Sequence, residues 1–219
     1  MKRISLFQWL PVLLLWVSPF ITYAQPADFV KVENAEKQNL IGQITKASNA
    51  VQTLECNFSE VKQLSFLTTP HRSNGKMYFK QPNSLKWEYT APEKQYFIFY
   101  QNKITYGNEQ NSSTYNTNSN KAFKALSELI VGFISGKALQ ENPNFEMTYY
   151  QNNSQVLVKL SPISKEMKKM VSEVELFLNK KSWLADKIVI YEISGDITRF
   201  SFSAVQTNNP IANEFFSIK

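Results

Sequence analysis

The stretch 74-NGKMYFKQPNSLKWEYTAP-92 holds two short runs in which large apolar and polar residues alternate, one on each side of a Pro-Asn corner. Such alternation predicts β-strands with one buried face, and the corner predicts a hairpin. The apolar positions are bulky and fall on one face of that hairpin: Met77, Phe79, Leu85, Trp87 and Tyr89. This face is expected either to fill a core or to line a cavity.

The period of two extends along most of the chain on both sides of this hairpin. Leu54, Cys56 and Phe58 begin a strand that is expected to reach about residue 67. Further alternating segments follow, each ended by a turn: 94–101, 103–108, 144–151, 154–162, 171–179, 180–195 and 196–206. Successive strands joined by tight turns pair in antiparallel fashion, so we expect one antiparallel sheet of about nine to eleven strands. An open sheet of this size tends to curl and so gains a concave face.

Helical spacing of apolar residues occurs in residues 28–52 and again in residues 119–139. A shorter helical piece is expected at 164–170. Residues 108–120 are rich in Asn and Ser, and we expect a surface loop there. Together these features predict an α+β protein whose helices lie on one face of the curled sheet.

The first 24 residues have the features of a secretory signal peptide. A basic start, Lys2 and Arg3, precedes the apolar stretch LPVLLLWVSPF, and Ala24 supplies a small residue before the expected cleavage point. We therefore expect an exported chain in which residues 25–219 form one domain. Loss of the two cations lowers the formal net charge from +6 to +4. The remaining lysines are scattered among acidic residues, which favours a solvated surface over a nucleic-acid site.

The sequence contains no motif typical of catalysis or of metal binding. Its one histidine, His71, falls in a polar segment expected to form a turn, and its one cysteine, Cys56, is expected to be buried in a strand. Six scattered glycines form neither a phosphate-binding loop nor a nucleophile elbow. Glu173 and Glu175 fall on the polar phase of a strand, which predicts a wet outer sheet face. We expect a protein that is not an enzyme and holds no cofactor or metal; an enzyme acting on lipid through His71 is the alternative.

The apolar positions of the strands have two interpretations, and the alternating pattern does not favour one over the other. If the helices fill the concave face, that face is a core. If the helices cover it loosely, it is a pocket for an apolar ligand, because ligand pockets are concave, mostly apolar and rich in aromatic residues.

Three parts of the sequence together resemble the LolA family of periplasmic lipoprotein carriers. The first is CNFSEVKQ at 56–63, the most specific is the block G-x6-P-x2-L-x-W-x4-P from Gly75 to Pro92, and the third is GDITRFSFSAVQTNNPIANEFF at 195–216. An Asn-rich segment followed by an amphipathic helix lies between the second and the third, as in the family. The resemblance covers residues 34–219.

This resemblance implies an incomplete, unclosed antiparallel β-barrel with helices forming a lid over its apolar concave face. It implies a monomeric carrier in the periplasm that holds the acyl chains of lipoproteins and takes them from the inner to the outer membrane. The implied partners are an inner-membrane transporter that releases lipoproteins and an outer-membrane acceptor. Two alternatives on the same fold are a carrier of another envelope lipid and a domain that senses lipoproteins.

Together with the alternation, the resemblance implies the residues of a lipid-binding cavity: Phe58, Met77, Phe79, Leu85, Trp87, Tyr89, Phe97, Phe99, Leu126, Ile130 and Phe133. It also implies that Gln81 and Pro82 gate the lid from the hairpin corner. Relatives often have an arginine before this proline, whose guanidinium can hydrogen-bond the lid backbone. The neutral amide of Gln81 makes such bonds without charge assistance. A hinge of the lid helix is expected at Gly132 or Gly136.

Overall fold

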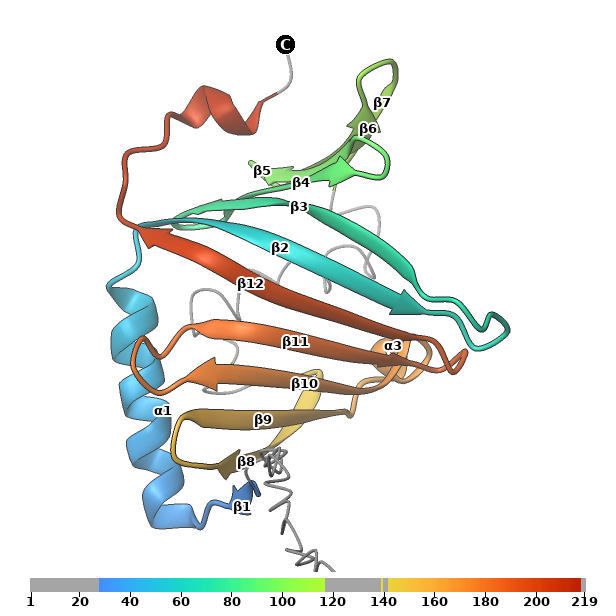
Figure 1. Ribbon diagram of the computed structural model, residues 1–219. Coiled ribbons are helices and arrows are strands. Elements are labelled where there is room, and N and C mark those ends of the chain that lie inside the picture. The colour runs from blue at the N-terminus through green and yellow to red at the C-terminus, as the bar shows by residue number, and fades with distance from the viewer. Residues whose placement is uncertain (1–27, 117–138, 140–141, 218–219) are drawn as a thin grey trace, which may run out of the picture.

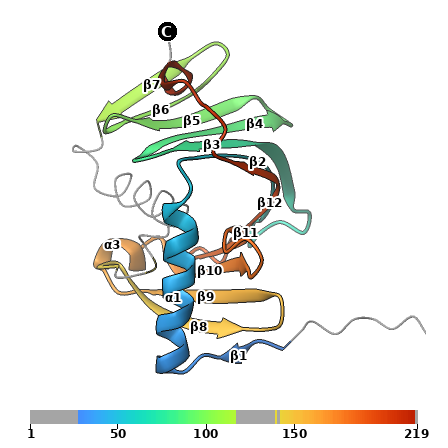
Figure 2. The same cartoon turned by 90° about the vertical axis from the view of Figure 1, so that its left-hand side faces the viewer.

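A computed structural model describes residues 28–116, 139 and 142–217 of the chain (Figure 1). The strands form one antiparallel sheet of twelve strands, in the order β1-β8-β9-β10-β11-β12-β2-β3-β4-β5-β6-β7. Their bounds are β1 Val30–Lys31, β2 Thr53–Gln63, β3 His71–Lys80, β4 Ser84–Ala91, β5 Gln95–Tyr100, β6 Lys103–Asn108, β7 Ser112–Asn116, β8 Phe145–Gln151, β9 Gln155–Pro162, β10 Val171–Asn179, β11 Ala185–Glu192 and β12 Ile197–Thr207. The sheet curls, and its edge strands β1 and β7 do not pair with each other (Figure 2). The predicted unclosed antiparallel barrel is confirmed.

Helix α1 (Asn34–Asn49) lies on the concave side of the curled sheet (Figure 2). The short helix α3 (Lys165–Lys168) joins β9 to β10, and the hydroxyl of Ser164 caps it by accepting a hydrogen bond from the amide of Met167. The 3-10 helix η3 (Asn213–Phe216) follows β12. No helix in the described part of the chain is long and apolar enough to cross a membrane.

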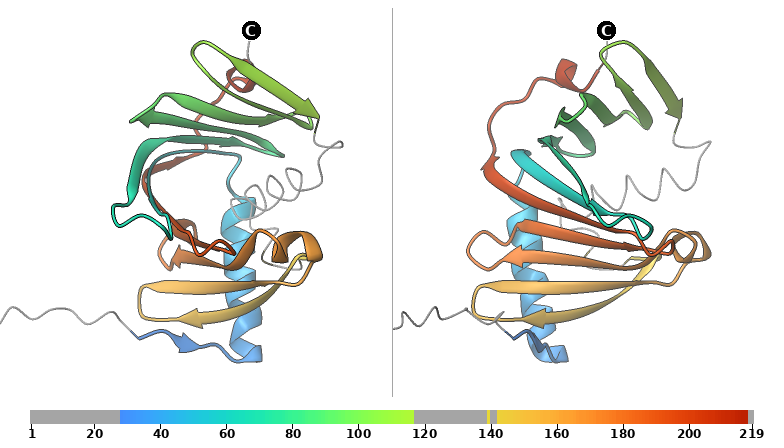
Figure 3. Two further views of the ribbon diagram at one scale, coloured as in Figure 1. Left: turned by 90° about the vertical axis from the view of Figure 1, so that its right-hand side faces the viewer. Right: turned by 45° about the vertical axis from the view of Figure 1, so that its right-hand side comes forward.

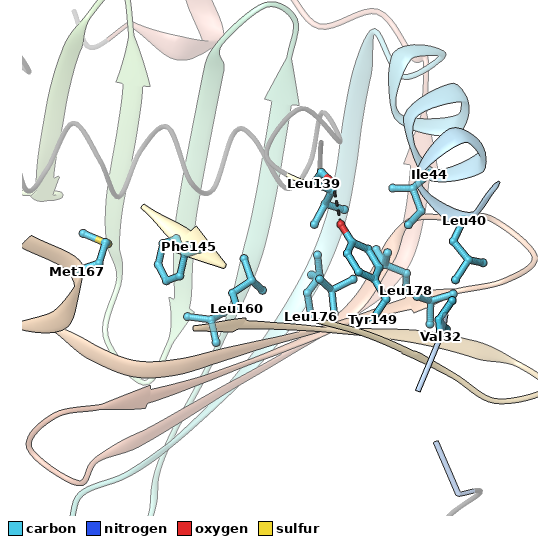
Figure 4. Close-up of a cluster of buried hydrophobic side chains, with 13 residues drawn as sticks. Val32, Leu40, Ile44, Leu139, Phe145, Tyr149, Leu160, Met167, Leu176 and Leu178 are labelled. Carbon is cyan, nitrogen blue, oxygen red and sulfur yellow. Dashed lines mark hydrogen bonds between the residues drawn. The ribbon is translucent and has the colours of Figure 1, made fainter. Parts of the chain in front are cut away.

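The half of the sheet beneath α1 has a closed apolar core, which we call the helix-packed half (Figure 4). Leu40 and Ile44, one helical turn apart on α1, are buried against the sheet. The sheet contributes mostly valine and leucine from β9 and β10: Val156, Val158, Leu160, Val174, Leu176 and Leu178. Tyr149 of β8 completes this core, and its hydroxyl donates a 2.8 Å hydrogen bond to the carbonyl of Leu139.

Glu173 and Glu175 lie on the outer face of the sheet, as predicted, although the same face of β9 to β11 also carries the buried residues Leu157 and Val189. Both carboxylates bind Lys159, at 3.2 and 2.9 Å from its Nζ. Hydrogen bonds to these carboxylates, the one to Glu175 first, raise the pKa of Lys159. This ion pair network lies on the opposite side of the sheet from the closed core, because successive residues of a strand point to opposite faces.

The outer face of β3 to β5 is covered by the C-terminal segment instead. The ring of Phe215 lies 4.7 Å from that of Tyr78 in an edge-on arrangement, and Phe216 stacks on Tyr100 at 6.2 Å. The Nζ atom of Lys80 donates a 2.6 Å hydrogen bond to the carbonyl of Ile211. The C-terminal segment therefore covers part of the outer face of β3 to β5. The candidate site lies on the concave face.

The sequence patterns miss two of the twelve strands. Strand β7 lies inside residues 108–120, where we expected a loop; every residue of this edge strand is exposed, so no apolar alternation marks it. Strand β1 has two residues and lies inside the predicted helix 28–52, which begins only at Asn34. The strand total therefore exceeds the predicted nine to eleven.

Two boundaries around the β2–β3 connection also differ from the prediction. Strand β2 ends at Gln63 rather than near residue 67, and His71 opens β3 instead of lying in a turn. His71 pairs with Lys62 at the far end of this hairpin. Both residues are polar, so hydrophobic periodicity does not reveal the extra length of the ladder.

Candidate functional site

The concave face of β2 to β6 carries two continuous rows of large apolar side chains. One row follows the strand register Leu54, Phe79, Leu85, Phe99 and Ile104. The next row follows Cys56, Met77, Trp87, Phe97 and Tyr106. Directly opposed residues in neighbouring antiparallel strands point to the same face. The alternating apolar residues of β2 to β6 thus form a broad apolar surface on the concave face. We call this part of the sheet the aromatic half.

All described members of the predicted cavity set belong to or pack against this one cluster: Phe58, Met77, Phe79, Leu85, Trp87, Tyr89, Phe97 and Phe99. The remaining members, Leu126, Ile130 and Phe133, lie outside the described residues, as do the hinge candidates Gly132 and Gly136.

The cluster also contains residues outside the predicted cavity set: Val51, Leu54, Cys56, Ile104, Leu184, Phe200 and Phe202. Phe200 and Phe202 could have been found, because they alternate with polar residues within TRFSFS. Leu184 could not, since it lies between β10 and β11 and joins the cluster through tertiary packing.

Gly75, the first residue of the family-like block, makes room for an aromatic ring. It pairs with Phe58 across β2 and β3. A Cβ atom at position 75 would lie 2.5 Å from Cζ of Phe58 and 2.1 Å from the carbonyl oxygen of Glu88. The ring of Phe58 therefore lies over the glycine, where it contacts Trp87 at 4.7 Å and Tyr89 at 5.1 Å between ring centroids. Aromatic side chains that cover a strand glycine in this way stabilise the pairing.

Two hollows adjoin the aromatic half. A small cavity of about 40 Å³ lies where the two halves of the sheet meet, between Ser48 of α1, Trp87 of β4 and Trp183 before β11. A larger hollow of about 430 Å³ is lined by Tyr89, Gln95, Tyr96, Phe97, Ile104, Tyr106 and Tyr115. The larger volume falls within the range of roughly 300–1,000 Å³ that is typical of ligand pockets.

Trp87 brings an unpaired hydrogen-bond donor into this apolar wall. Its side chain is 8% exposed, and its indole Nε1 is the one buried side-chain nitrogen or oxygen without a partner among the described residues. Leaving a buried donor unpaired costs about 1–3 kcal/mol. A buried polar group without a partner is rare in native structures, and an acceptor that binds there is one explanation for it.

The neighbouring hydroxyl of Tyr89 is also a donor. Burial, together with the negative charge of Glu60, raises the pKa of Tyr89, so its hydroxyl stays protonated throughout the neutral range. A hydrogen bond to the Glu60 carboxylate also raises this pKa, so the Tyr89 proton points at Glu60. The Trp87 indole lies close enough to the Tyr89 hydroxyl to oppose part of the rise, but forms no well-aligned hydrogen bond with it. The site therefore combines a large apolar surface with one unpaired donor, and ligand pockets are likewise mostly apolar with few polar groups.

The reactive side chains of this region are poorly suited to catalysis. Burial, followed by the charge of Glu55, raises the pKa of the Cys56 thiol to about 12, so the nucleophilic thiolate is absent at neutral pH. His71 is exposed, and its Nδ1 lies 3.3 Å from the hydroxyl oxygen of Ser73. Among the described residues, no group of three His, Cys, Asp or Glu side chains could hold a metal ion.

Gln81 joins the hairpin corner to the segment that follows α1. Its Nε2 donates a 2.7 Å hydrogen bond to the carbonyl of Val51, and its backbone amide donates to the carbonyl of Gln52 at 2.8 Å. The predicted lid helix, residues 119–139, lies almost entirely outside the described residues. The described contacts thus tie Gln81 to the end of α1, on the same side of the sheet as the aromatic half.

The fold and site define a class of proteins, the incomplete antiparallel barrels with an apolar concave face. Within that class the chain belongs to the LolA family: the family model described as outer membrane lipoprotein carrier protein LolA matches residues 49–219. No curated protein matches the chain at a significant level.

Solved structures of similar fold have low sequence identity to the chain. MucB has a TM-score of 0.50 and 11% identity, over 85% of this chain and 64% of MucB. A LolA superfamily protein of Nitrosomonas europaea has a TM-score of 0.45 and 9% identity, over 83% of this chain and 97% of its own. Lipoprotein LppX of Mycobacterium tuberculosis has a TM-score of 0.41 and 10% identity, over 82% of this chain and 99% of its own.

Proposed function

We propose that this protein is a periplasmic carrier that encloses the acyl chains of lipoproteins and takes them from the inner to the outer membrane. The observation that supports this most strongly is the apolar, aromatic wall of β2 to β6, which adjoins a hollow of about 430 Å³. Membership of a family described as lipoprotein carriers supports the same function. In this proposal the protein receives its cargo from an inner-membrane transporter, delivers it to an outer-membrane acceptor, and acts as a monomer without catalysis.

The physical requirement for such a carrier follows from the hydrophobic effect. Each methylene group that is buried gains about 0.8 kcal/mol, so an acyl chain in water needs continuous shelter. Large aromatic rings offer much apolar surface for this purpose. Phe58, Trp87 and Phe97 are such rings on the concave face.

The unpaired indole N–H of Trp87 gives the proposed pocket a polar anchor. We assign it the ester or amide carbonyl at the head of a bound acyl chain as acceptor. The hydroxyl of Tyr89 lies beside it but donates its proton toward the Glu60 carboxylate, so the indole is the donor assigned to cargo. In this arrangement cargo binding satisfies a donor that the empty protein leaves unpaired.

Gating of the pocket is proposed to involve Gln81 and Pro82. The hydrogen bonds from Gln81 to Val51 and Gln52 hold the β3–β4 corner against the end of α1. Movement of α1 away from the sheet would have to break or stretch these bonds. A neutral amide makes them weaker than a guanidinium would, which favours easier opening.

The proposal is tested by mass spectrometry of lipids extracted from the protein purified from the periplasm, and by titration with a fluorescent apolar probe. We expect wild-type protein to carry acylated molecules and to bind the probe. Trp87→Arg and Leu85→Glu place a charge on the apolar wall and should abolish both. Thr90→Arg puts a charge on the exposed outer phase of the same strand and should leave both unchanged.

The outcomes separate carriage from its alternatives. Absence of lipid and of probe binding from the wild-type protein would sink the proposal. Extracted lipids other than lipoprotein acyl chains would identify a carrier of another envelope lipid. Cargo that is bound but never passed to membranes would instead favour a sensor domain.

A further inference from the structure

A group of exposed apolar side chains lies at the end of the sheet where the β2–β3 connection projects. Phe66 is 77% exposed, and Leu67, Ile193 and Met170 are exposed as well. They come from three connections: residues 64–70 between β2 and β3, the turn between β11 and β12, and the segment after α3. These connections lie at one end of the molecule, the end that faces the viewer in Figure 3, left. We call this group the apolar tip.

Hydrogen bonds link the three connections to one another. The amide of Ser65 donates to Oδ1 of Asp196 at 2.8 Å, which joins the β2–β3 connection to the β11–β12 turn. The amide of Ile193 donates to the carbonyl of Met170 at 3.2 Å, which joins that turn to the end of α3. The three connections that form the tip are therefore hydrogen-bonded to one another.

The charges around the apolar tip are mainly positive. Lys165, Lys168 and Lys169 are exposed beside Met170, and Arg72 is exposed at the start of β3. Glu192 is neutralised by its pair with Lys62 at 3.0 Å, whereas Asp196, which accepts the bond from Ser65, and the exposed Glu166 keep their negative charges. The four exposed cations outnumber these two acids, so this end of the molecule is positive on balance.

We propose that the apolar tip docks on the surface of a membrane containing anionic phospholipid. Apolar side chains that project from connections, flanked by lysine and arginine, match the boundary between headgroups and acyl chains. The β2–β3 connection projects beyond the end of the sheet (Figure 1), and the tip residues do not line either of the two hollows described above. This favours insertion into a fluid lipid surface over recognition of a protein segment.

The position of the tip suits a protein whose concave face handles lipid, although the proposal does not depend on that function. Strand β2 carries Cys56 and Phe58 in the aromatic half and then runs directly into the connection that holds Phe66. The end with α1 and Gln81 lies at the other extreme of this strand. Docking by the tip would therefore leave the α1 end free in solution.

The test is flotation of the exported, processed protein with vesicles of phosphatidylcholine alone or with added phosphatidylglycerol. We expect wild-type protein to float with the anionic vesicles. Phe66→Ser combined with Leu67→Ser should reduce the floated fraction at least roughly tenfold, because both residues lose their apolar surface. Val30→Ser removes a comparably exposed apolar residue at the edge strand β1 and should have no effect.

The charge contribution is tested by a matched pair of double variants. Lys168→Glu with Lys169→Glu should abolish the preference for phosphatidylglycerol. Lys46→Glu with Lys181→Glu makes the same change in net charge at exposed sites away from the tip and should preserve it. The Trp87→Arg variant should still float, which separates docking from capture of single lipids in the concave face.

Two results would overturn the proposal. One is wild-type protein that stays at the bottom of the gradient with both kinds of vesicle, which would leave this end of the molecule to a protein partner. The other is an equal loss of flotation in the tip variants and in their controls, with circular dichroism showing that all are folded.

Discussion

The two halves of the sheet share one backbone ladder but differ in what lies on their concave faces. The helix-packed half is built largely from valine and leucine and is closed by Leu40 and Ile44 of α1. The aromatic half adds phenylalanine and tryptophan rings to its aliphatic side chains, adjoins two hollows and contains an unpaired donor. One curled sheet thus carries a closed, mainly aliphatic core beside an aromatic face with hollows.

The contrast follows from side-chain shape as well as from the helix. Branched aliphatic side chains interdigitate and leave few voids when a helix packs on them. The rings of Phe58, Trp87 and Phe200 contact one another at angles, with 4.7–6.2 Å between ring centroids, and the hollows lie beside this cluster. Truncations in the helix-packed half should therefore cost stability and leave binding intact. Changes to the aromatic half should alter binding as well as stability, because Phe79 and Leu85 are fully buried there.

The largest expected effect is on the stability of the helix-packed half. Leu160 of β9 is fully buried, so Leu160→Ala should lower the free energy of unfolding by about 2–5 kcal/mol. Chemical denaturation measures this change, and probe binding by the folded variant should persist. Leu67→Ala, at an exposed position, is the control and should change stability by less than about 0.5 kcal/mol. A similar loss in both variants would contradict the division between the halves.

The next effect tests whether Phe58 needs the space above Gly75. Gly75→Ala inserts a Cβ atom 2.5 Å from the Phe58 ring, and should destabilise the protein by about 1–3 kcal/mol and weaken probe binding as the ring is displaced. Gly42→Ala is the control, because no atom lies within 4 Å of the new Cβ. That control, in the middle of α1, should raise stability by up to about 1 kcal/mol. Tolerance of Gly75→Ala in both measurements would show that the Phe58 ring and the Glu88 backbone, whose carbonyl oxygen lies 2.1 Å from the new Cβ, can both shift.

A smaller effect tests the indole donor. Trp87→Phe keeps the aromatic surface and removes the N–H, so binding of an acyl ester should weaken by roughly five- to tenfold, the worth of one hydrogen bond. Stability of the empty protein should not fall by a comparable amount, since the lost donor has no partner.

Nuclear magnetic resonance tests independently the proposed hydrogen bond from the Trp87 indole to a bound acyl ester. The chain beyond residue 24 has two tryptophans, Trp87 and Trp183, so two indole N–H signals are expected. The Trp87 signal should move downfield when an acyl ester binds. Its invariance, with binding otherwise intact, would rule out the proposed hydrogen bond.

The smallest expected effect concerns Cys56, at the centre of the aromatic half. Because burial raises the pKa of its thiol to about 12, a thiol reagent at pH 8 should label the folded protein far more slowly than the unfolded chain. The raised pKa of Cys56 also makes the stability of the fold depend on pH. Above pH 9 the unfolded chain loses the thiol proton while the folded protein keeps it, so this group lowers the free energy of unfolding as pH rises. Fast labelling of the folded protein would reveal that the aromatic half opens readily.

Much of the aromatic half could be predicted because its signal is local. Met77, Trp87 and Phe97 lie in short runs with a strict period of two, and each run is ended by a turn. The edge strand β7 lacked such a signal, since its exposed residues, including Tyr115, form no apolar face. Leu184 joined the cluster from between two strands, where no periodicity applies.

The sequence by itself determined which side chains share a face, because alternation along a strand is a property of the backbone. It also determined that Cys56 would be buried and that Glu173 and Glu175 would lie on the outer face. Only the tertiary structure decided that α1 closes one half of the concave face, that Phe58 lies over Gly75, and that Trp87 keeps an unpaired donor. These features depend on the curl of the sheet, which brings together residues far apart in the chain and is set by packing across the whole fold.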